Sequence, residues 1–189
     1  GAPALWTSAE PSPDGSLLLA THLERPFSYA VPFGSFPATC QVLDLRGEVL
    51  RTVAKSPLRE SVPIGGVPTG PRSIGWIDAL PHSLTWVEAQ DGGDPQRDVE
   101  HRDVVLRLDD LAGEAKPWFE TQHRFAGIDY ASDGRLALVS EFDRRTRRQR
   151  VWRGDAVDPA VALTQLYERS TQDAYGDPGR PLLEVRANG

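Results

Sequence analysis

The chain has 189 residues, of which 39% are hydrophobic and 25% are charged, and its formal net charge is −6. The acidic balance argues against a general nucleic-acid binder, and a lone cysteine, Cys40, excludes an intrachain disulfide and a cysteine-rich zinc site. No apolar run is long enough for a membrane-spanning helix, and no signal-peptide core is recognisable. The absence of methionine indicates a processed product or a piece of a longer protein.

The first predicted element is a short strand over residues 5–8. The turn Pro13-Asp14-Gly15 follows, because Asp-Gly suits a hairpin that needs positive φ. An apolar strand runs on to about Leu23. After a long polar excursion, two further strands are expected at residues 40–45 and 49–53.

This order of four strands recurs twice. The second copy has a first strand over 73–76, a hairpin that continues to Val87, and strands at 104–108 and 117–119. The third copy has a first strand over 126–130, a second Asp-Gly turn at 133–134, and strands at 149–152 and 162–166. A helical turn or two over 159–167 is the alternative there, since Val161, Leu163 and Leu166 fit either structure.

A four-stranded repeat of about 50 residues is the signature of a propeller blade. The sequence therefore predicts an all-β fold, a partial β-propeller of about three four-stranded antiparallel blades within one domain, 1–189. The blades fall at about 5–56, 72–121 and 124–170, and residues 171–189 form a connection or the start of a next blade. An ordinary β-sandwich is the alternative architecture.

Three blades are too few to close a ring, since propellers have about 4–8. An open arc leaves a blade face bare at each end. We therefore expect either a longer parent protein or self-association through the open faces.

Three loops carry candidate functional residues. The excursion that contains Arg25, Phe27 and Tyr29 is long, and long loops are often functional. The acidic loop 90–95 is expected to form a turn with Asx-type hydrogen bonds, although Asp91 is also a candidate for substrate contact or, with Asp94, for calcium. The basic run 144–150 is expected to be a solvated hairpin tip, with a docking or acidic-substrate contact as the alternative.

Three collinear stretches resemble the glutamyl endopeptidase branch of the prolyl oligopeptidase family. They begin at Arg25-Pro26-Phe27-Ser28-Tyr29, at Arg72-Ser73-Ile74-Gly75-Trp76 and at Asp173-Ala174-Tyr175-Gly176. The second stretch continues through 84–94. The resemblance implies a β-propeller that covers a C-terminal α/β-hydrolase domain, in which a Ser-Asp-His triad cleaves peptides after glutamate.

The chain departs from the family at the nucleophile, because no serine lies in a G-x-S-x-G motif. We therefore expect no catalytic residue, no metal, no cofactor and no peptidase activity in this chain alone. The resemblance implies gating and positioning of peptide substrates for the absent hydrolase domain, its expected partner, with neither nucleic-acid binding nor membrane insertion.

Four residues are the predicted substrate-binding set, Arg25, Tyr29, Arg72 and Asp91. A glutamate side chain needs a cationic partner, best met by a bidentate arginine, and Arg25 and Arg72 are the candidates. The compartment stays open: related bacterial proteins suggest the periplasm or export, and the cytoplasm is the alternative. A non-enzymatic propeller that binds other proteins is the alternative function.

Overall fold

The chain forms a fan of three antiparallel, four-stranded sheets. The computed structural model describes residues 4–61, 63–131, 133–179 and 181. Within that part, the only helical element is the 3-10 turn η1 (Phe33–Ser35). The all-β expectation and the partial propeller of three four-stranded blades are confirmed. The end of the predicted connection 171–189 lies largely outside the described residues.

Each blade contains four strands that follow one another in chain order. Blade 1 consists of β1 (Leu5–Pro11), β2 (Leu17–Leu23), β3 (Ala38–Asp44) and β4 (Val49–Ser56). Blade 2 consists of β5 (Arg72–Trp76), β6 (Leu84–Ala89), β7 (Asp103–Leu108) and β8 (Lys116–Thr121). Blade 3 consists of β9 (Arg124–Tyr130), β10 (Leu136–Asp143), β11 (Arg148–Asp155) and β12 (Thr164–Ser170).

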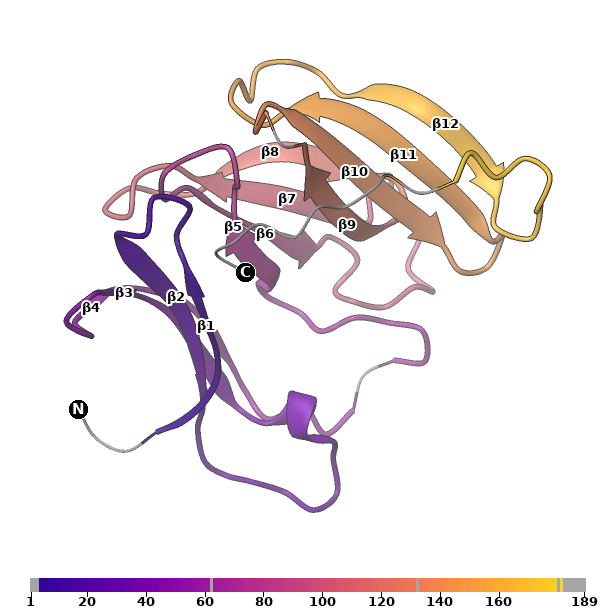
Figure 1. The fold of residues 1–189 in the computed structure, drawn as a ribbon. Coiled ribbons are helices and arrows are strands. Elements are labelled where there is room, and N and C mark those ends of the chain that lie inside the picture. The colour runs from indigo at the N-terminus through magenta and orange to yellow at the C-terminus, as the bar shows by residue number, and fades with distance from the viewer. Residues whose placement is uncertain (1–3, 62, 132, 180, 182–189) are drawn as a thin grey trace.

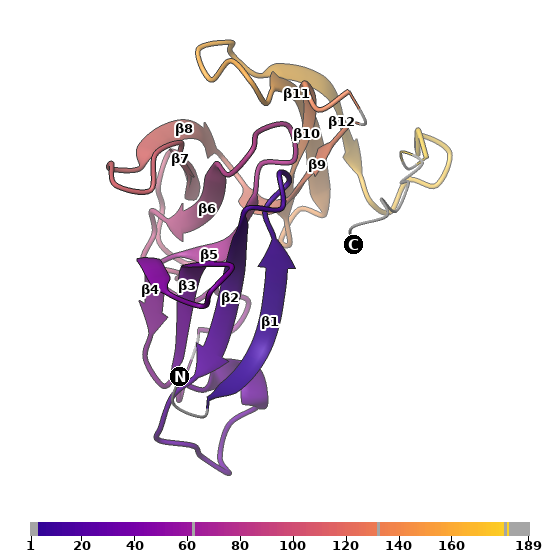
Figure 2. The same ribbon diagram turned by 60° about the vertical axis from the view of Figure 1, so that its left-hand side comes forward.

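The blades splay so that their first strands share one side of the fan. Figure 1 shows β1, β5 and β9 on the concave side and β4, β8 and β12 on the convex side. Figure 2 shows the three sheets following one another as separate layers. This radial arrangement of meandering sheets distinguishes blades from the two facing sheets of a sandwich.

The helical alternative over residues 159–167 is wrong. A turn closes at Asp158–Val161, and β12 then pairs antiparallel with β11, with Tyr167 opposite Val151. The free edge of β11 offers hydrogen bonds to the residues from Thr164 onward, which a helix of one or two turns cannot replace. The described residues contain no helix long and apolar enough to cross a membrane.

The two Asp-Gly turns form as the sequence predicts. Gly15 and Gly134 both have φ of +71°, which favours glycine. The carboxylate of Asp14 accepts hydrogen bonds from Ser12 Oγ at 2.6 Å and Ser16 N at 3.0 Å. These bonds, led by the one from Ser12, hold the pKa of Asp14 below its usual range. Gly134 also has to be small, because a Cβ there would lie 3.1 Å from Ala79 Cα of blade 2.

Blades 1 and 2 share an apolar core. It contains eight buried side chains: Leu19, Cys40, Val42, Ala54, Trp76, Leu84, Trp86 and Leu108. Polar bonds cross the same contact: Trp76 Nε1 donates to the Glu10 carbonyl at 3.1 Å, and Arg51 Nη1 donates to the Leu111 and Gly113 carbonyls at 2.6 and 2.7 Å. Each blade thus buries one face against the next, as stacked repeats do.

Blades 2 and 3 meet through a smaller core of Ile77, Ala137 and Ala156, on which Trp118 and Ile128 pack. Arg107 crosses this contact and donates to the Ala156 carbonyl at 2.9 Å. Its guanidinium also lies 5.5 Å from the ring centre of Trp118. Cation–π stacking and a charge-assisted hydrogen bond therefore supplement the limited apolar burial.

Leu84→Ala should show how far stability depends on the core between blades 1 and 2. Leu84 is fully buried, so the cavity should lower the free energy of unfolding by about 2–5 kcal/mol. Leu45→Ala is the matched control, because Leu45 lies in a hairpin turn and is 69% exposed. Urea unfolding followed by tryptophan fluorescence measures both. Equal losses for the two variants would contradict this core assignment.

Candidate functional site

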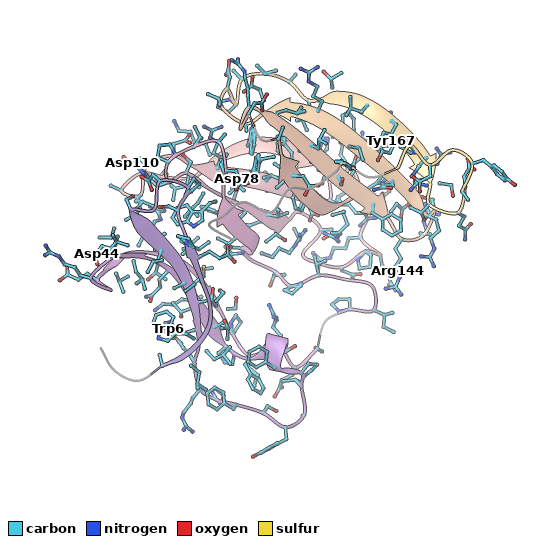
Figure 3. The ribbon with its side chains drawn as sticks, in the orientation of Figure 1. Trp6, Asp44, Asp78, Asp110, Arg144 and Tyr167 are labelled. Atoms are coloured by element: carbon cyan, nitrogen blue, oxygen red, sulfur yellow. The ribbon has the colours of Figure 1, made fainter. Side chains whose placement is uncertain are left out.

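The candidate residues gather at one end of the blades, which we call the connection end. Strand direction alternates along each meander, so the loops between second and third strands lie at the same end as the segments between blades. The connection end therefore comprises 24–37, 57–71, 90–102, 122–123 and 144–147. Figure 3 places Arg144 of this end on the far side of the molecule from Asp44 and Asp110, which mark the opposite hairpin end.

A buried charge cluster lies at the connection end, where β5, β7 and β9 begin. Asp103 opens β7, and its carboxylate is fully buried. One of its oxygens lies 2.5 Å from Arg72 Nη2 and 2.8 Å from Arg124 Nη1, and the other accepts the backbone N–H of Phe125 at 2.7 Å. Asp103 therefore ties the first strands of blades 2 and 3 together.

Asp91 completes the charge cluster from the loop 90–102. Its Oδ1 accepts the N–H of Gly93 at 2.9 Å, which is the Asx-type turn expected from the sequence. Its Oδ2 accepts Arg102 Nη1 at 2.8 Å and Arg124 Nη2 at 2.5 Å. Burial raises the pKa of Asp91, but the bonds from Arg124 and Arg102 outweigh it and leave the pKa lowered.

The charge cluster consists of three arginines, Arg72, Arg102 and Arg124, and two aspartates, Asp91 and Asp103. Its formal charge is +1, three positive charges against two negative. Arg72 Nε is buried and has no hydrogen-bond partner among the described residues. Arg72 also borders a hollow of about 200 Å³ between blades 1 and 2, lined in part by Glu10, Thr21 and Cys40.

A third buried carboxylate, Glu141 of β10, serves the connection between β8 and β9. Glu141 is fully buried. It accepts the N–H of His123 at 2.6 Å and Trp152 Nε1 at 2.9 Å, and Arg150 lies 3.7 Å from it. The two residues between blades 2 and 3 are thus held from both strands of the β10–β11 hairpin.

The segment 57–71 links the charge cluster to the predicted residues of blade 1. Val67 N donates to the Gly93 carbonyl at 3.0 Å, and neither Gly66 nor Gly93 has room for a Cβ. Near its other end, Arg59 N donates to the Ser35 carbonyl at 2.9 Å. This segment therefore joins the loop of Asp91 to the excursion 24–37.

Arg25 and Tyr29 lie in the excursion 24–37 and face solvent. Tyr29 is fully exposed, and the Arg25 guanidinium lies 5.4 Å from the ring centre of Phe27. Phe36 packs against both Phe27 and Phe33, at 5.5 and 6.3 Å between ring centres. A small, partly exposed aromatic cluster thus shapes the excursion, while Arg25 and Tyr29 stay accessible.

The structure divides the predicted set into two pairs. Arg72 and Asp91 belong to the buried charge cluster, where Arg72 lies against Asp103, Asp91 pairs with Arg124, and Asp103 and Arg124 pair with each other. Arg25 and Tyr29 are exposed, and the segment 57–71 links their loop to the charge cluster through backbone hydrogen bonds. The substrate-binding role of all four stays a prediction.

The charge cluster does not have the chemistry of a calcium site. Calcium needs several free oxygen ligands, whereas the carboxylate of Asp91 is occupied by N–H donors. Among the residues that the structure describes, no group of three or more His, Cys, Asp or Glu side chains is placed to hold a metal ion.

Sequence reasoning missed Arg102, Asp103, Arg124 and Glu141. Asp103 and Glu141 lie beside or within apolar strands, and a charge in that position signals a buried partner. Arg124 lies 21 residues from Asp103 and 33 residues from Asp91 along the chain. No local spacing in the sequence therefore reveals these pairs.

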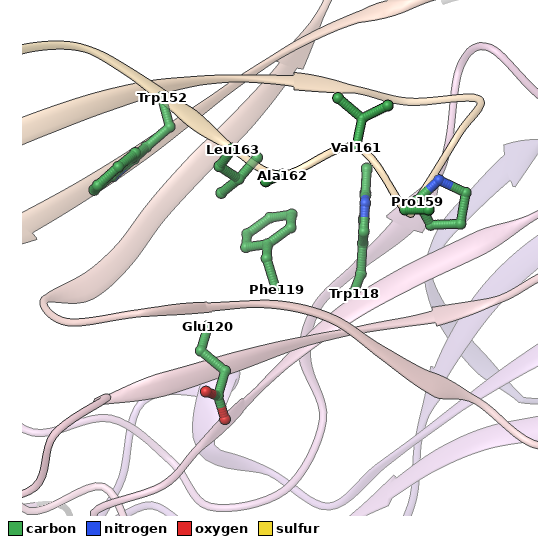
Figure 4. A pocket seen from close by; sticks show the side chains of 9 residues that line it. Trp118, Phe119, Glu120, Trp152, Pro159, Val161, Ala162 and Leu163 are labelled. Atoms are coloured by element: carbon green, nitrogen blue, oxygen red, sulfur yellow. The ribbon is translucent and has the colours of Figure 1, made fainter.

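A groove of about 330 Å³ lies between β8 and the segment 159–163, near the hairpin end. Trp118 and Phe119 form one wall, and Val161 and Leu163 face them across it (Figure 4). None of the four predicted residues lines this groove. It follows the outer edge of the contact between blades 2 and 3.

Comparison with known proteins places the chain beside peptidases. It is 39% identical over 197 aligned positions to a probable glutamyl endopeptidase, chloroplastic, of Oryza sativa subsp. japonica, covering 100% of this chain and 21% of that protein. It is 40% identical over 191 positions to the protein of the same name from Arabidopsis thaliana, covering 97% of this chain and 19% of that protein. The chain thus spans about a fifth of the length of these relatives. No family model matches it.

Two solved structures resemble the fold at low identity. An oligogalacturonate lyase in complex with manganese superposes with a TM-score of 0.51 at 12% identity, covering 89% of this chain and 43% of that one. The β-propeller domain of the trilobed protease from Pyrococcus furiosus gives a TM-score of 0.47 at 13% identity, covering 88% of this chain and 42% of that one. At such identities the likeness to the lyase concerns the fold alone.

Asp91→Asn should destabilise the chain strongly at neutral pH, because it leaves Arg102 and Arg124 short of a buried counter-charge. We expect a loss of about 3–5 kcal/mol in the free energy of unfolding. Asp94→Asn is the matched control in the same loop, since Asp94 is partly exposed and accepts only a backbone N–H, from Gln96. Urea unfolding monitored by circular dichroism compares the variants.

The loss of unfolding free energy in Asp91→Asn should depend on pH in a defined direction. The pKa of Asp91 is lowered on folding from the ordinary value of 3.8, so its contribution is complete above pH 3.8 and disappears as the pH falls through the folded-state pKa. The difference between wild type and Asp91→Asn should therefore be constant near neutrality and shrink in acid. A difference that grows on acidification would contradict the assignment.

Proposed function

We propose that this chain, a partial β-propeller of the glutamyl endopeptidase family, gates and positions peptide substrates for a catalytic domain elsewhere in its parent protein. The observation that carries the proposal is the identity of 39–40% along nearly the whole chain to two probable glutamyl endopeptidases. Because the chain covers only about a fifth of them, the activity belongs to the parent protein.

The catalytic chemistry that we propose for the parent is that of a serine peptidase of the prolyl oligopeptidase family. Such an enzyme uses an activated serine and an oxyanion hole in an α/β-hydrolase domain. This chain has no nucleophile elbow of that kind. Its contribution is therefore selection and orientation of the substrate.

The connection end supports the gating role. A gate needs a rigid frame and accessible loops, and functional residues commonly lie on loops held by a rigid scaffold. The charge cluster and the segment 57–71 supply the frame, since they bridge blades 2 and 3 and reach blade 1. The excursion 24–37 supplies exposed side chains that an extended peptide can contact, among them Tyr29 and Phe33.

The outward faces of blades 1 and 3 support a continuing propeller. The outward face of blade 3 carries Leu138 and Tyr167, both only partly buried, on the side opposite the core shared with blade 2. On blade 1, Trp6 is 51% exposed and packs only edge-on against His22 among the described aromatic contacts. We propose that neighbouring blades of the parent cover these faces, with self-association as the alternative for the isolated chain.

Arg25 is the better of the two candidates for reading a glutamate side chain. Arg25 is exposed and forms no ion pair among the described residues, so its guanidinium is free to bind a carboxylate. Arg72 is mostly buried and already lies against Asp103. A substrate carboxylate at Arg72 would have to share the guanidinium with that aspartate.

In the parent enzyme, Arg25→Gln should reduce the preference for glutamate over glutamine at the cleaved bond. A lost charge-assisted hydrogen bond is worth about 1.5–3 kcal/mol, so the ratio of kcat/KM for the two substrates should fall about tenfold or more. Arg46→Gln, at a hairpin turn of the opposite end, is the control. If Arg25→Gln keeps the full preference, glutamate is read elsewhere, for example in the hydrolase domain.

The gating role has its own test in the same enzyme. A glutamate-containing sequence should be cleaved as a short peptide and resist cleavage when grafted into a surface loop of a stably folded protein. Removal of the propeller should reduce this discrimination if the separate hydrolase domain stays folded and active towards the short peptide. A parent with no peptidase activity would instead favour the non-enzymatic interaction module.

A further inference from the structure

We infer that the tip of the β10–β11 hairpin is a docking site for acidic segments of an extended polypeptide. This site, which we call the arginine tip, consists of Arg144, Arg145 and Arg147. It deepens the proposed function, because it assigns a charge preference to the polypeptide that approaches the connection end. The site lies apart from Arg25 and from the buried charge cluster.

The arginine tip is an uncompensated positive charge on an acidic chain. Arg144, Arg145 and Arg147 are exposed, and none forms an ion pair within the described residues. Most other arginines of blade 3 do have a carboxylate partner: Arg124, Arg135, Arg148, Arg150 and Arg169. The net charge of the whole chain is −6, so the sign of the tip is opposite to that of the chain as a whole.

The acidic residue nearest in sequence, Asp143, forms no ion pair with the tip arginines within the described part of the chain. Its carboxylate accepts the N–H of Arg145 at 2.9 Å and the hydroxyl of Thr146 at 2.6 Å, which uses it to build the turn. Burial raises the pKa of Asp143, but the turn bonds, led by that of Thr146, outweigh it and leave the pKa lowered.

The backbone of the arginine tip is held in a fixed shape. Besides the two bonds to Asp143, the Arg147 carbonyl accepts the N–H of Thr171 at 2.8 Å, which anchors the hairpin to the segment after β12. Arg147 has φ of +58°, a left-handed conformation that is uncommon for a residue with a side chain. A backbone that is already ordered loses little further conformational entropy when the tip binds a ligand.

An apolar contact borders the arginine tip. Arg144 Nη1 lies 3.6 Å from the position that a Cβ on Gly65 would take, so its guanidinium reaches over the segment 57–71. The neighbouring residue Ile64 is 98% exposed. The surface therefore offers an exposed aliphatic side chain next in sequence to the glycine over which the Arg144 guanidinium reaches.

These features fit an extended acidic peptide with occasional apolar residues. Guanidinium groups bind carboxylates through paired hydrogen bonds, and Ile64 offers a contact for an apolar side chain. Stacking platforms for nucleobases, which single-stranded nucleic-acid sites require, are missing from this set of residues. The chemistry at the arginine tip therefore favours a carboxylate-rich polypeptide.

The test is the binding of a fluorescein-labelled, glutamate-rich peptide to the full chain, measured by fluorescence anisotropy. The same peptide with every Glu replaced by Gln, and a single-stranded oligonucleotide, are the comparison probes. The triple variant R144Q/R145Q/R147Q removes the charges and keeps a side chain at Arg147. The matched control R46Q/K116Q/R153Q removes three exposed charges near the hairpin end that form no ion pair within the described residues.

We expect the glutamate-rich peptide to bind about tenfold more weakly to R144Q/R145Q/R147Q than to wild type or to the control variant, since exposed charge pairs are individually weak. Added salt should weaken the wild-type binding, because exposed charges are screened. Equal affinity of the triple variant and the control, or tighter wild-type binding of the glutamine peptide or the oligonucleotide, would overturn the inference. The assay needs no cleavage, so a parent without peptidase activity would refute the proposed function and leave this result standing.

Discussion

The arrangement of the connection end depends on the pairing of two fully buried carboxylates, Asp91 and Asp103, with three arginines. An unpaired charge cannot remain inside a protein at reasonable cost, so the first strands of blades 2 and 3 and the loop 90–102 have to meet where these groups meet. The segment 57–71 then follows, because Val67 binds the backbone of the Asp91 loop. Moving any of these elements would leave a buried carboxylate without its counter-charge.

Such a cluster contributes more to positioning than to net stability. Replacing a buried ion pair by well-packed apolar residues is often neutral or stabilising, so apolar contacts alone could have held the blades together. The register of β5 illustrates what the ion pairs add. Arg72 lies opposite Val87 while Gly75 lies opposite Thr85, and the irregularity between them places Ser73 at φ of +51°. We attribute this costly conformation of Ser73 to the contact of Arg72 with Asp103. That contact fixes the Arg72 side chain, while β5 from Gly75 onward stays in register with β6.

The fold follows from local patterns, whereas the charge cluster does not. Asp14-Gly15 and Asp133-Gly134 fix two hairpins through side-chain-to-backbone bonds within the turn itself, so the sequence predicts them and, through their repeat, the blades. The short apolar run with Val161 and Leu166 stayed ambiguous because only the free edge of β11 selects a strand there. Arg124 gives no local signal at all: its partners are chosen by how blade 3 docks on blade 2. The same reason explains why Arg72, singled out from the sequence as a reader of glutamate, turns out to be committed largely to Asp103.

The two ends of the blades differ in how they are built. The hairpin end closes with short turns, two of which pack against their neighbours: Asp14 N donates to the Pro81 carbonyl at 3.3 Å, and Gly134 lies against Ala79. The connection end carries the long segments 24–37, 57–71 and 90–102, whose backbones are tied to one another, while Tyr29, Ile64 and the arginine tip project outward. Since a surface for recognition requires a fixed backbone with free side chains, the connection end meets both requirements, with aromatic groups on blade 1 and positive charge on blade 3.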